Sequence, residues 1–230
     1  MQLLENLDGI FIDFYGTIAG GDRAVVERTS GRVAADLNLS LSAAELASQW
    51  GRVFFGYLDR HNGDAFHSLT GIERLSLVET VAPMVGTIDP NPYVDELTAY
   101  WRRPPLHPEA AEALRALPVP LCCVSNVDTA DLLAACEHHG LAFDHIITSE
   151  DTRSYKPDNH IFNVALERTG WRPECVIHVG DSLHSDVMGA HRAGLRAVWI
   201  RREDRILDIG QADPEWTISD LRGLLTLENH

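Results

Sequence analysis

Short apolar runs and amphipathic stretches alternate along most of this chain. Residues 9–13, 119–124 and 175–179 are apolar at almost every position, which is typical of strands buried on both faces of a sheet. Residues 196–200, and more weakly 143–148, follow the same pattern. The other stretches have helical spacing, and they cover residues 108–117, 128–139, 158–169 and 185–193. Strands that alternate with helices in this way predict an α/β fold with βαβ units and a parallel sheet.

The region from residue 20 to residue 103 has a different pattern, with no convincing strand. Four long amphipathic stretches fill it, at residues 24–37, 43–60, 66–81 and 92–101. Ser42 and Glu45 form the capping-box pattern at the start of the second stretch. We therefore predict an all-helical domain at 20–103, inserted just after the first strand into a core formed by residues 1–19 and 104–230. An insertion at that place would cover the carboxyl edge of the sheet.

Charge and composition narrow the class of partner. The chain has 230 residues and a formal net charge of −15, with no basic cluster, so neither nucleic acid nor an anionic membrane surface is an expected partner. No apolar run approaches the ~18 residues of a membrane span, and the first residues lack the features of a signal peptide. The four cysteines form no C-x-x-C pair, so we expect buried free thiols in a reducing compartment. These features predict a cytoplasmic protein that acts on a small molecule.

Polar residues stand at the carboxyl ends of the predicted strands or in the loops that follow them. Each group alone fits ordinary turn or capping chemistry, but the ends of parallel strands converge on one crevice. The groups, in chain order, are Asp13 in DFYGT, Ser125-Asn126 after LCCV, Lys156-Pro157, and Asp181 to Asp186 in GDSLHSD. Their combination in this order predicts one site at the carboxyl edge of the sheet.

The residue types at this predicted site indicate phosphoryl transfer. Asp13, Asp181 and Asp186 would bring negative charges together, and a divalent cation such as Mg²⁺ would relieve their repulsion. Ser125, the backbone amides beyond it and Lys156 would supply donors for a bound anion. Lys156 is the single lysine in a chain with eighteen arginines, which is modest support for a special role. A carboxylate nucleophile, a magnesium site and an anion cradle together describe hydrolysis through an aspartyl-phosphate.

These motifs resemble the haloacid dehalogenase-like hydrolase superfamily, and the resemblance covers essentially the whole chain. It implies a Rossmann-like core, and the helical insertion looks like the type-1 cap of that family. On this resemblance Asp13 is the nucleophile, and Thr17 hydrogen-bonds near it. Ser125 and Asn126 bind the transferred group, Lys156 steadies its charge, and Asp181 ligates magnesium with Asp186 nearby. The resemblance permits a monomer or a homodimer.

Tyr15 separates two branches of the family. The phosphatases usually carry Asp two residues after the nucleophile, where it protonates the leaving alcohol, and a phenol is a poor base at neutral pH. The backbone carbonyl of Tyr15 could still ligate the metal. The pattern Asp-x-Tyr-Gly-Thr is instead similar to the motif of the L-2-haloacid dehalogenase branch. In that reaction the leaving group is a halide, which needs no proton. That branch works without metal and replaces the Gly-Asp of the last motif, whereas Gly180-Asp181 is intact here.

Three functions therefore stay open. A Mg²⁺-dependent phosphatase of a small monoester is favoured, because Asp181 and Asp186 need a counter-cation. A 2-haloacid dehalogenase-like hydrolase and a catalytically impaired binder of a phosphorylated ligand are the alternatives. We assign no histidine as a ligand and expect His178 to be a hydrogen-bonded core residue. Trp50, Phe54, Phe55 and Tyr57 are expected to pack between helices of the cap rather than to contact substrate.

Overall fold

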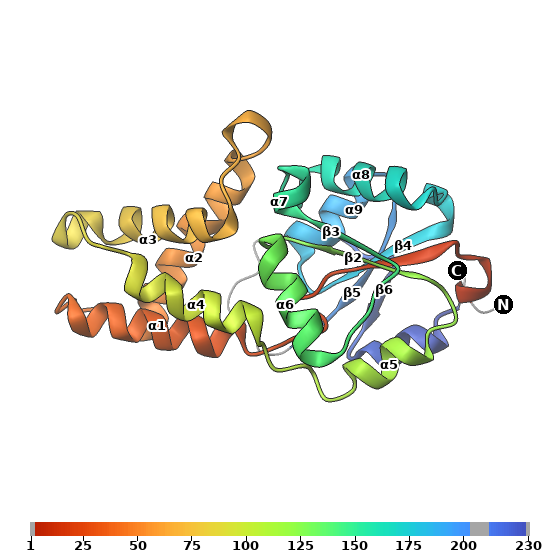
Figure 1. Ribbon diagram of the computed structural model, residues 1–230, viewed down its shortest axis with the longest axis horizontal. Helices are drawn as coiled ribbons and strands as arrows, with labels where there is room; N and C mark the ends of the chain where they lie inside the picture. The colour runs from red at the N-terminus through yellow and green to blue at the C-terminus, as the bar shows by residue number, and fades with distance from the viewer. Residues whose placement is uncertain (1–2, 203–211, 229–230) are drawn as a thin grey trace.

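The computed structural model describes residues 3–202 and 212–228, and its core is a parallel sheet with helices on both faces (Figure 1). The strands follow the order β3-β2-β1-β4-β5-β6, and every neighbouring pair is parallel. Their bounds are Gly9–Ile12 (β1), Leu121–Ser125 (β2), His145–Thr148 (β3), Val176–Gly180 (β4), Arg196–Ile200 (β5) and Trp216–Ile218 (β6). The predicted α/β class, the parallel sheet and its first five strands are confirmed.

Alternate residues of the central strand enter two separate apolar clusters, which is why the sheet is buried on both faces. Ile10 and Ile12 pack with the helices α5 and α6, whereas Phe11 faces the helices α8 and α9. The helices of the core are α5 (Ala110–Ala116), α6 (Thr129–His139), α7 (Ser149–Thr152), α8 (Asn159–Thr169) and α9 (Gly189–Arg192). A π-helical turn, Leu183–Met188, leads into α9, so the stretch predicted as one helix at 185–193 has two parts.

Short 3-10 segments connect several of these elements. They are Leu3–Asn6, Gly63–Ala65, Pro173–Cys175 and Leu221–Thr226. The last of these packs near α5 on the face that holds Ile10. Cys122, Cys123 and Cys136 are buried free thiols as expected, while Cys175 is half-buried. No described helix combines the length and the apolar character that crossing a membrane requires.

An all-helical cap lies beside the sheet and follows directly on β1 (Figure 1). Its helices are α1 (Asp22–Asp36), α2 (Ala43–Arg60), α3 (Leu69–Val85) and α4 (Asn91–Arg102). The predicted capping box opens α2, because the Glu45 amide donates to Ser42 Oγ and the Ser42 amide donates back to the Glu45 carboxylate. The cap has an apolar cluster of its own around Leu46, Trp50 and Leu77. The helical insertion is confirmed, and its limits at residues 20 and 103 stay predictions.

Polar contacts fix the cap over the carboxyl edge of the sheet. The Asp128 carboxylate, just before α6, accepts hydrogen bonds from the amides of Leu69 and Thr70 at the start of α3. Arg102 at the end of α4 pairs with Asp131 of α6 at 2.7 Å. On the other side, His184 contacts Asp59 of α2, and Asn62 accepts a bond from the Tyr155 amide. Cap residues therefore line one side of the crevice at the strand ends.

Candidate active site

The strand order brings three of the predicted groups to one point. β1 lies between β2 and β4, so Asp13, directly after β1, has Ser125 of β2 on one side and Asp181, directly after β4, on the other. The Asp13 amide donates to the Val179 carbonyl of β4 at 2.9 Å. Ser125 Oγ donates to Asp13 Oδ1, also at 2.9 Å. The register of the sheet thus fixes the Asp13 backbone against β4 and its carboxylate against β2.

Lys156 lies at the centre of the charged groups and is almost fully buried. Its Nζ donates to Asp13 Oδ1 at 2.7 Å, to Asp186 Oδ1 at 2.6 Å and to the Val124 carbonyl at 2.9 Å. Burial alone would lower the pKa of Lys156, but the two carboxylates outweigh it and raise the pKa above its ordinary value. All three donors of the ammonium group are used, so Lys156 stays charged and holds its loop against the sheet.

Asn126 holds the backbone of the Lys156 loop. Its side-chain amide donates to the Lys156 carbonyl at 3.0 Å, and its side-chain oxygen accepts from the Lys156 amide at 2.8 Å. Asn126 also lines the cavity above the site. The contacts in this structure are those of a residue that places the lysine, and its predicted role in binding the transferred group stays a prediction.

Asp186 is held by three donors from different parts of the core. It accepts from Lys156, from His178 Nε2 at 2.8 Å and from the Ser182 amide at 3.0 Å. Burial works against its charge, but Lys156 and the His178 bond lower the pKa of Asp186 below its usual range. His178 is the expected hydrogen-bonded core histidine, and its partner is the charged network. His178 and Asp186 are eight positions apart in the sequence, and the turn after β4 brings them together. The sequence pattern alone did not predict this pair.

Three carboxylates form a group that suits a metal ion. Oxygens of Asp13, Asp181 and Asp186 lie within 4.8 Å of one another, and all three side chains are buried. The donor set is entirely carboxylate oxygen, which fits a hard cation such as Mg²⁺. Gly16 makes room for this group, because a Cβ there would lie 2.5 Å from Asp181 Oδ2, and its φ of +89° also favours glycine. The residues present therefore fit the predicted magnesium.

Burial and the neighbouring Asp186 raise the pKa of Asp13, while the Lys156 ammonium and the Ser125 hydroxyl oppose this shift. Both opposing donors bond to Oδ1. Within the described part of the chain, Oδ2 is therefore the oxygen left for attack. A cation beside Asp13 would lower its pKa further and keep the carboxylate ionised.

Tyr15 connects the core to the cap. Its hydroxyl donates to the Trp101 carbonyl at the end of α4, at 2.6 Å, and its ring meets Phe14 and Trp101 edge to face. Burial raises the pKa of Tyr15 above its ordinary value, so the phenol keeps its proton. That proton is directed at the cap backbone. The predicted catalytic and metal-binding roles of Tyr15 stay predictions.

Thr17 is fully buried beside this turn, and its Oγ1 has no hydrogen-bond partner among residues 3–202 and 212–228. Its backbone carbonyl accepts from Arg202 at 2.8 Å. The predicted hydrogen bond of Thr17 near Asp13 is therefore not formed in this structure. The role of its hydroxyl stays a prediction.

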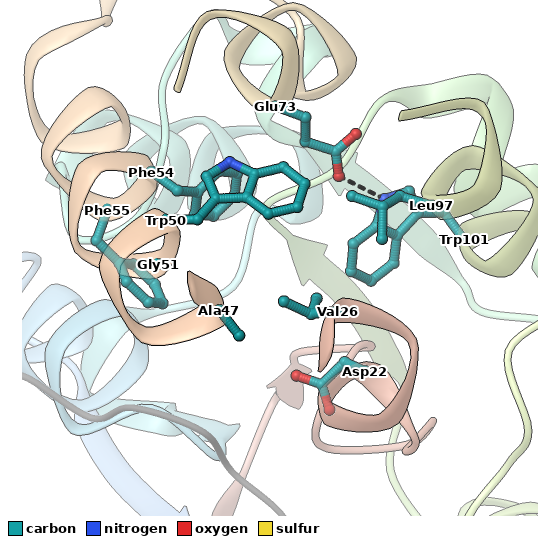
Figure 2. A pocket seen from close by; sticks show the side chains of 10 residues that line it. All are labelled: Asp22, Val26, Ala47, Trp50, Gly51, Phe54, Phe55, Glu73, Leu97 and Trp101. Atoms are coloured by element: carbon teal, nitrogen blue, oxygen red, sulfur yellow. Dashed lines mark hydrogen bonds between the residues drawn. The ribbon is translucent and has the colours of Figure 1, made fainter. Parts of the chain in front are cut away.

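One cavity lies over the site and another lies inside the cap, and each has a volume of about 140 Å³. The first is lined from the core by the acidic group, Ser125, Asn126 and Lys156, and from the cap mainly by apolar side chains. The second lies among the cap helices (Figure 2). They share Asp22, Phe54, Phe55 and Trp101. Phe54 and Phe55 pack against the apolar clusters of the cap, as expected, and they also line both cavities.

Glu73 of α3 lines the cap cavity, and no motif in the sequence marks it as a site residue. Only 2% of it is exposed, and its Oε1 accepts from Trp101 Nε1 at 2.7 Å. Burial raises the pKa of Glu73 to about 8; Asp128 and Asp131 add to this shift, while the Trp101 bond and Arg74 oppose it. Glu73 is therefore a buried acid that lies outside the group of Asp13, Asp181 and Asp186.

We expect Glu73→Gln to stabilise the protein at alkaline pH. Because the pKa of Glu73 is raised from 4.5 to about 8 by folding, the native protein loses stability as the pH rises through this window. Glutamine stays neutral, so the variant should be equally stable at pH 4 and more stable above pH 8, by on the order of 4 kcal/mol. Urea unfolding at pH 4.5, 7 and 9 measures the difference. A difference that does not change with pH would show that Glu73 titrates normally.

The sequence profile of the haloacid dehalogenase-like hydrolases matches residues 7–194. The chain belongs to this family. The resemblance of its motifs is thereby confirmed, and the protein is a hydrolase of the haloacid dehalogenase-like type.

Relatives of this hydrolase include both a dehalogenase and a phosphatase, the two kinds of enzyme that the sequence left open. An (S)-2-haloacid dehalogenase of Pseudomonas sp. (strain YL) is 27% identical over 133 residues, which are 56% of this chain and 57% of that protein. A phosphoserine phosphatase of Thermus thermophilus is 38% identical over 135 residues, 55% of this chain and 53% of that protein. The chain thus spans just over half the length of these curated relatives.

Solved structures of dehalogenases have the same fold over nearly the whole chain. An L-2-haloacid dehalogenase from Xanthobacter autotrophicus superposes with a TM-score of 0.74 and 20% identity, covering 95% of this chain and 96% of that one. Likeness at this identity shows the Rossmann-like core and its cap, and it leaves the substrate of this hydrolase open.

Proposed function

We propose that this hydrolase is a Mg²⁺-dependent phosphatase of a small phosphate monoester, acting through an aspartyl-phosphate on Asp13. The observation that carries the proposal is the group of three buried carboxylates at Asp13, Asp181 and Asp186, within 4.8 Å of one another. Lys156 is the one cationic side chain among the described residues that line this cavity. A divalent cation would balance the negative charge that Lys156 leaves over, so that the carboxylates would not repel a phosphate dianion.

Each residue has a defined task in this reaction. Asp13 Oδ2 attacks phosphorus, and the bond from phosphorus to the ester oxygen breaks. Ser125 and Lys156 hold Oδ1, so that the carboxylate cannot rotate away from the in-line position. Asp181 and Asp186 would hold the magnesium together with Asp13, and the ion would neutralise the negative charge that develops on the phosphoryl oxygens. Water then attacks phosphorus, the bond from phosphorus to Oδ2 breaks, and the Asp13 carboxylate is released with inorganic phosphate. The proton that this water gives up balances the proton that the departing alkoxide takes from solvent.

A panel of phosphate monoesters, with phosphate release measured in Mg²⁺ and in EDTA, tests this proposal. We expect turnover that EDTA abolishes and that added Mg²⁺ restores. Isothermal titration with Mg²⁺ in the absence of substrate gives an independent readout at Asp13, Asp181 and Asp186. Release of phosphate that ignores the chelator, or no release from any ester, would contradict the proposal.

Carbon–halogen hydrolysis is the second candidate, because Tyr15 stands two residues after Asp13 and one relative is an (S)-2-haloacid dehalogenase. A halide needs no proton to leave, so the engagement of the Tyr15 hydroxyl with Trp101 would cost nothing in that reaction. Halide release from (S)-2-chloropropionate in the presence of EDTA would favour this function. Tight Mg²⁺ binding without turnover of either substrate class would favour a catalytically impaired phospho-ligand binder.

Tyr15→Asp should raise phosphatase turnover if Tyr15 is a missing general acid. A positioned acid is worth roughly 10²- to 10⁴-fold in rate, and we expect at least a tenfold gain because the loss of the Trp101 contact offsets part of it. The gain should be larger for an alkyl phosphate than for 4-nitrophenyl phosphate, whose leaving group needs no proton. Steady-state kcat values for both esters measure the effect.

Tyr15→Phe is the matched control for this prediction. It removes the hydroxyl bond to the Trp101 carbonyl and keeps the ring between Phe14 and Trp101. An equal gain in Tyr15→Phe and Tyr15→Asp would trace the effect to release of the cap. An equal gain for alkyl and aryl phosphates would likewise argue against acid catalysis.

A further inference from the structure

The cap cavity adjoins the active-site cavity. Both are lined by Asp22, Phe54, Phe55 and Trp101, so a molecule with its phosphate at Asp13 would reach the cap cavity once these side chains make way. The walls of the cap cavity are mainly apolar and aromatic, with side chains from α1, α2, α3 and α4. This space therefore suits the part of the substrate that leaves with the alcohol oxygen.

Glu73 makes one wall of this cavity polar. Figure 2 shows its carboxyl group reaching from α3 to Trp101, with Trp50 and Phe54 on the other side. Its Oε1 accepts from the Trp101 indole at 2.7 Å. Its Oε2 is buried and has no hydrogen-bond partner within the described parts of the chain. A buried carboxyl oxygen without a partner disfavours the ionised form, and a cation in the cavity beside the carboxyl group would offset this cost by its charge.

The surroundings of Glu73 favour a cationic ligand. Trp50, Phe54 and Trp101 present aromatic rings, and Asp22 supplies a second carboxylate on another wall. No arginine, lysine or histidine is among the described residues that line the cap cavity. Aromatic rings combined with carboxylates are a usual environment for a substituted ammonium group, whereas a second anion on the substrate would meet two acids.

We propose that Glu73 determines specificity by binding an ammonium group at the far end of the substrate, so that the phosphatase prefers monoesters whose apolar body carries an amine. This inference rests on the proposed phosphatase function for the position of the phosphate. The amine site itself stands on the cap cavity alone. Burial raises the pKa of Glu73 to about 8, and an ammonium group bound beside it would lower this pKa again by stabilising the ionised form.

Matched aryl phosphates test the inference by turnover. The amine is 4-(2-aminoethyl)phenyl phosphate, the neutral analogue is 4-ethylphenyl phosphate, and the anionic analogue is 4-(2-carboxyethyl)phenyl phosphate. We expect kcat/KM for the amine to exceed that for the neutral ester at least tenfold, mainly through KM, and the anionic ester to be the poorest. In Glu73→Gln and Glu73→Met the ratio of amine to neutral ester should fall to about one. Equal kcat/KM for amine and neutral ester in the native protein would overturn the inference.

Glu79→Gln is the matched control, because Glu79 is an exposed acid on the same helix and contacts Tyr57 outside the cavity. It should keep the preference for the amine, and loss of the preference in this variant too would assign it to the general charge of the cap.

Binding of the free amine separates this inference from the proposed function. Calorimetry with 4-(2-aminoethyl)phenol, without any phosphate, should show binding that Glu73→Gln weakens at least tenfold. Such binding without turnover of any phosphate ester would leave the amine site in place and contradict the phosphatase. Turnover of phosphate esters without this binding would contradict the amine site alone.

Discussion

An Asp13→Asn variant is expected to lose at least 10³-fold in kcat on every phosphate ester while keeping the native fold, a magnitude typical for the loss of a covalent nucleophile. The amide removes the attacking carboxylate but keeps an oxygen that can accept from Ser125 and Lys156. Because burial raises the pKa of Asp13, neutralising this side chain should cost the folded state little. Mg²⁺ affinity should fall as well, since one of the three carboxylates is lost.

Phosphate release and circular dichroism measured on the same preparations check this expectation. Asp8→Asn is the matched control, because Asp8 pairs with Arg172 at the surface and lies outside the site cavity. Its activity should stay within about twofold of the native value, as is usual for a surface substitution. Activity retained by Asp13→Asn would assign the nucleophile to another group and end the aspartyl-phosphate mechanism.

Lys156→Met is expected to have the largest effect on stability. Lys156 lies 2.7 Å from Asp13 and 2.6 Å from Asp186, and all three side chains are buried. Removing the one ammonium group leaves two carboxylates without a compensating charge, which typically costs about 3–5 kcal/mol. Urea unfolding in EDTA measures this loss. Mg²⁺ should restore more stability to the variant than it adds to the native protein, because the ion takes over part of the neutralisation.

Two further variants make the Lys156 prediction specific. The double variant Lys156→Met/Asp186→Asn should recover part of the loss, because it removes one of the two uncompensated charges. Arg222→Met breaks an exposed ion pair with Asp220 and should cost no more than about 1 kcal/mol. If Lys156→Met costs as little as Arg222→Met, the buried charges are already balanced by groups other than Lys156.

Much of the fold and most of the acidic site follow from local sequence signals. Runs such as residues 119–124 identify buried strands, and the polar groups at their carboxyl ends converge because the sheet is parallel. β6 was missed, since it has only three residues at the edge of the sheet and alternates buried with exposed positions. A short strand of this kind has no pattern that distinguishes it from a loop.

The contacts that the sequence did not predict all depend on tertiary packing. Glu73 lies in α3 among positions with helical spacing, and its burial is fixed by Trp101, which lies 28 residues further along the chain. The bond from Tyr15 to the Trp101 carbonyl spans 86 residues. Neither pair shares a motif, so only the docking of α4 against the nucleophile loop shows that they meet.

Trp101 makes three kinds of contact with different parts of one residue. Its carbonyl accepts from Tyr15, its indole N–H donates to Glu73, and its side chain lines both cavities. In the proposed phosphatase, the two ends of a bound ester would therefore lie against parts of the same residue. A movement of the cap that separates Trp101 from Tyr15 would then change both the phosphate end and the amine end of the cavity at once. Recognition of the leaving group and access of water to phosphorus would be coupled through this one residue.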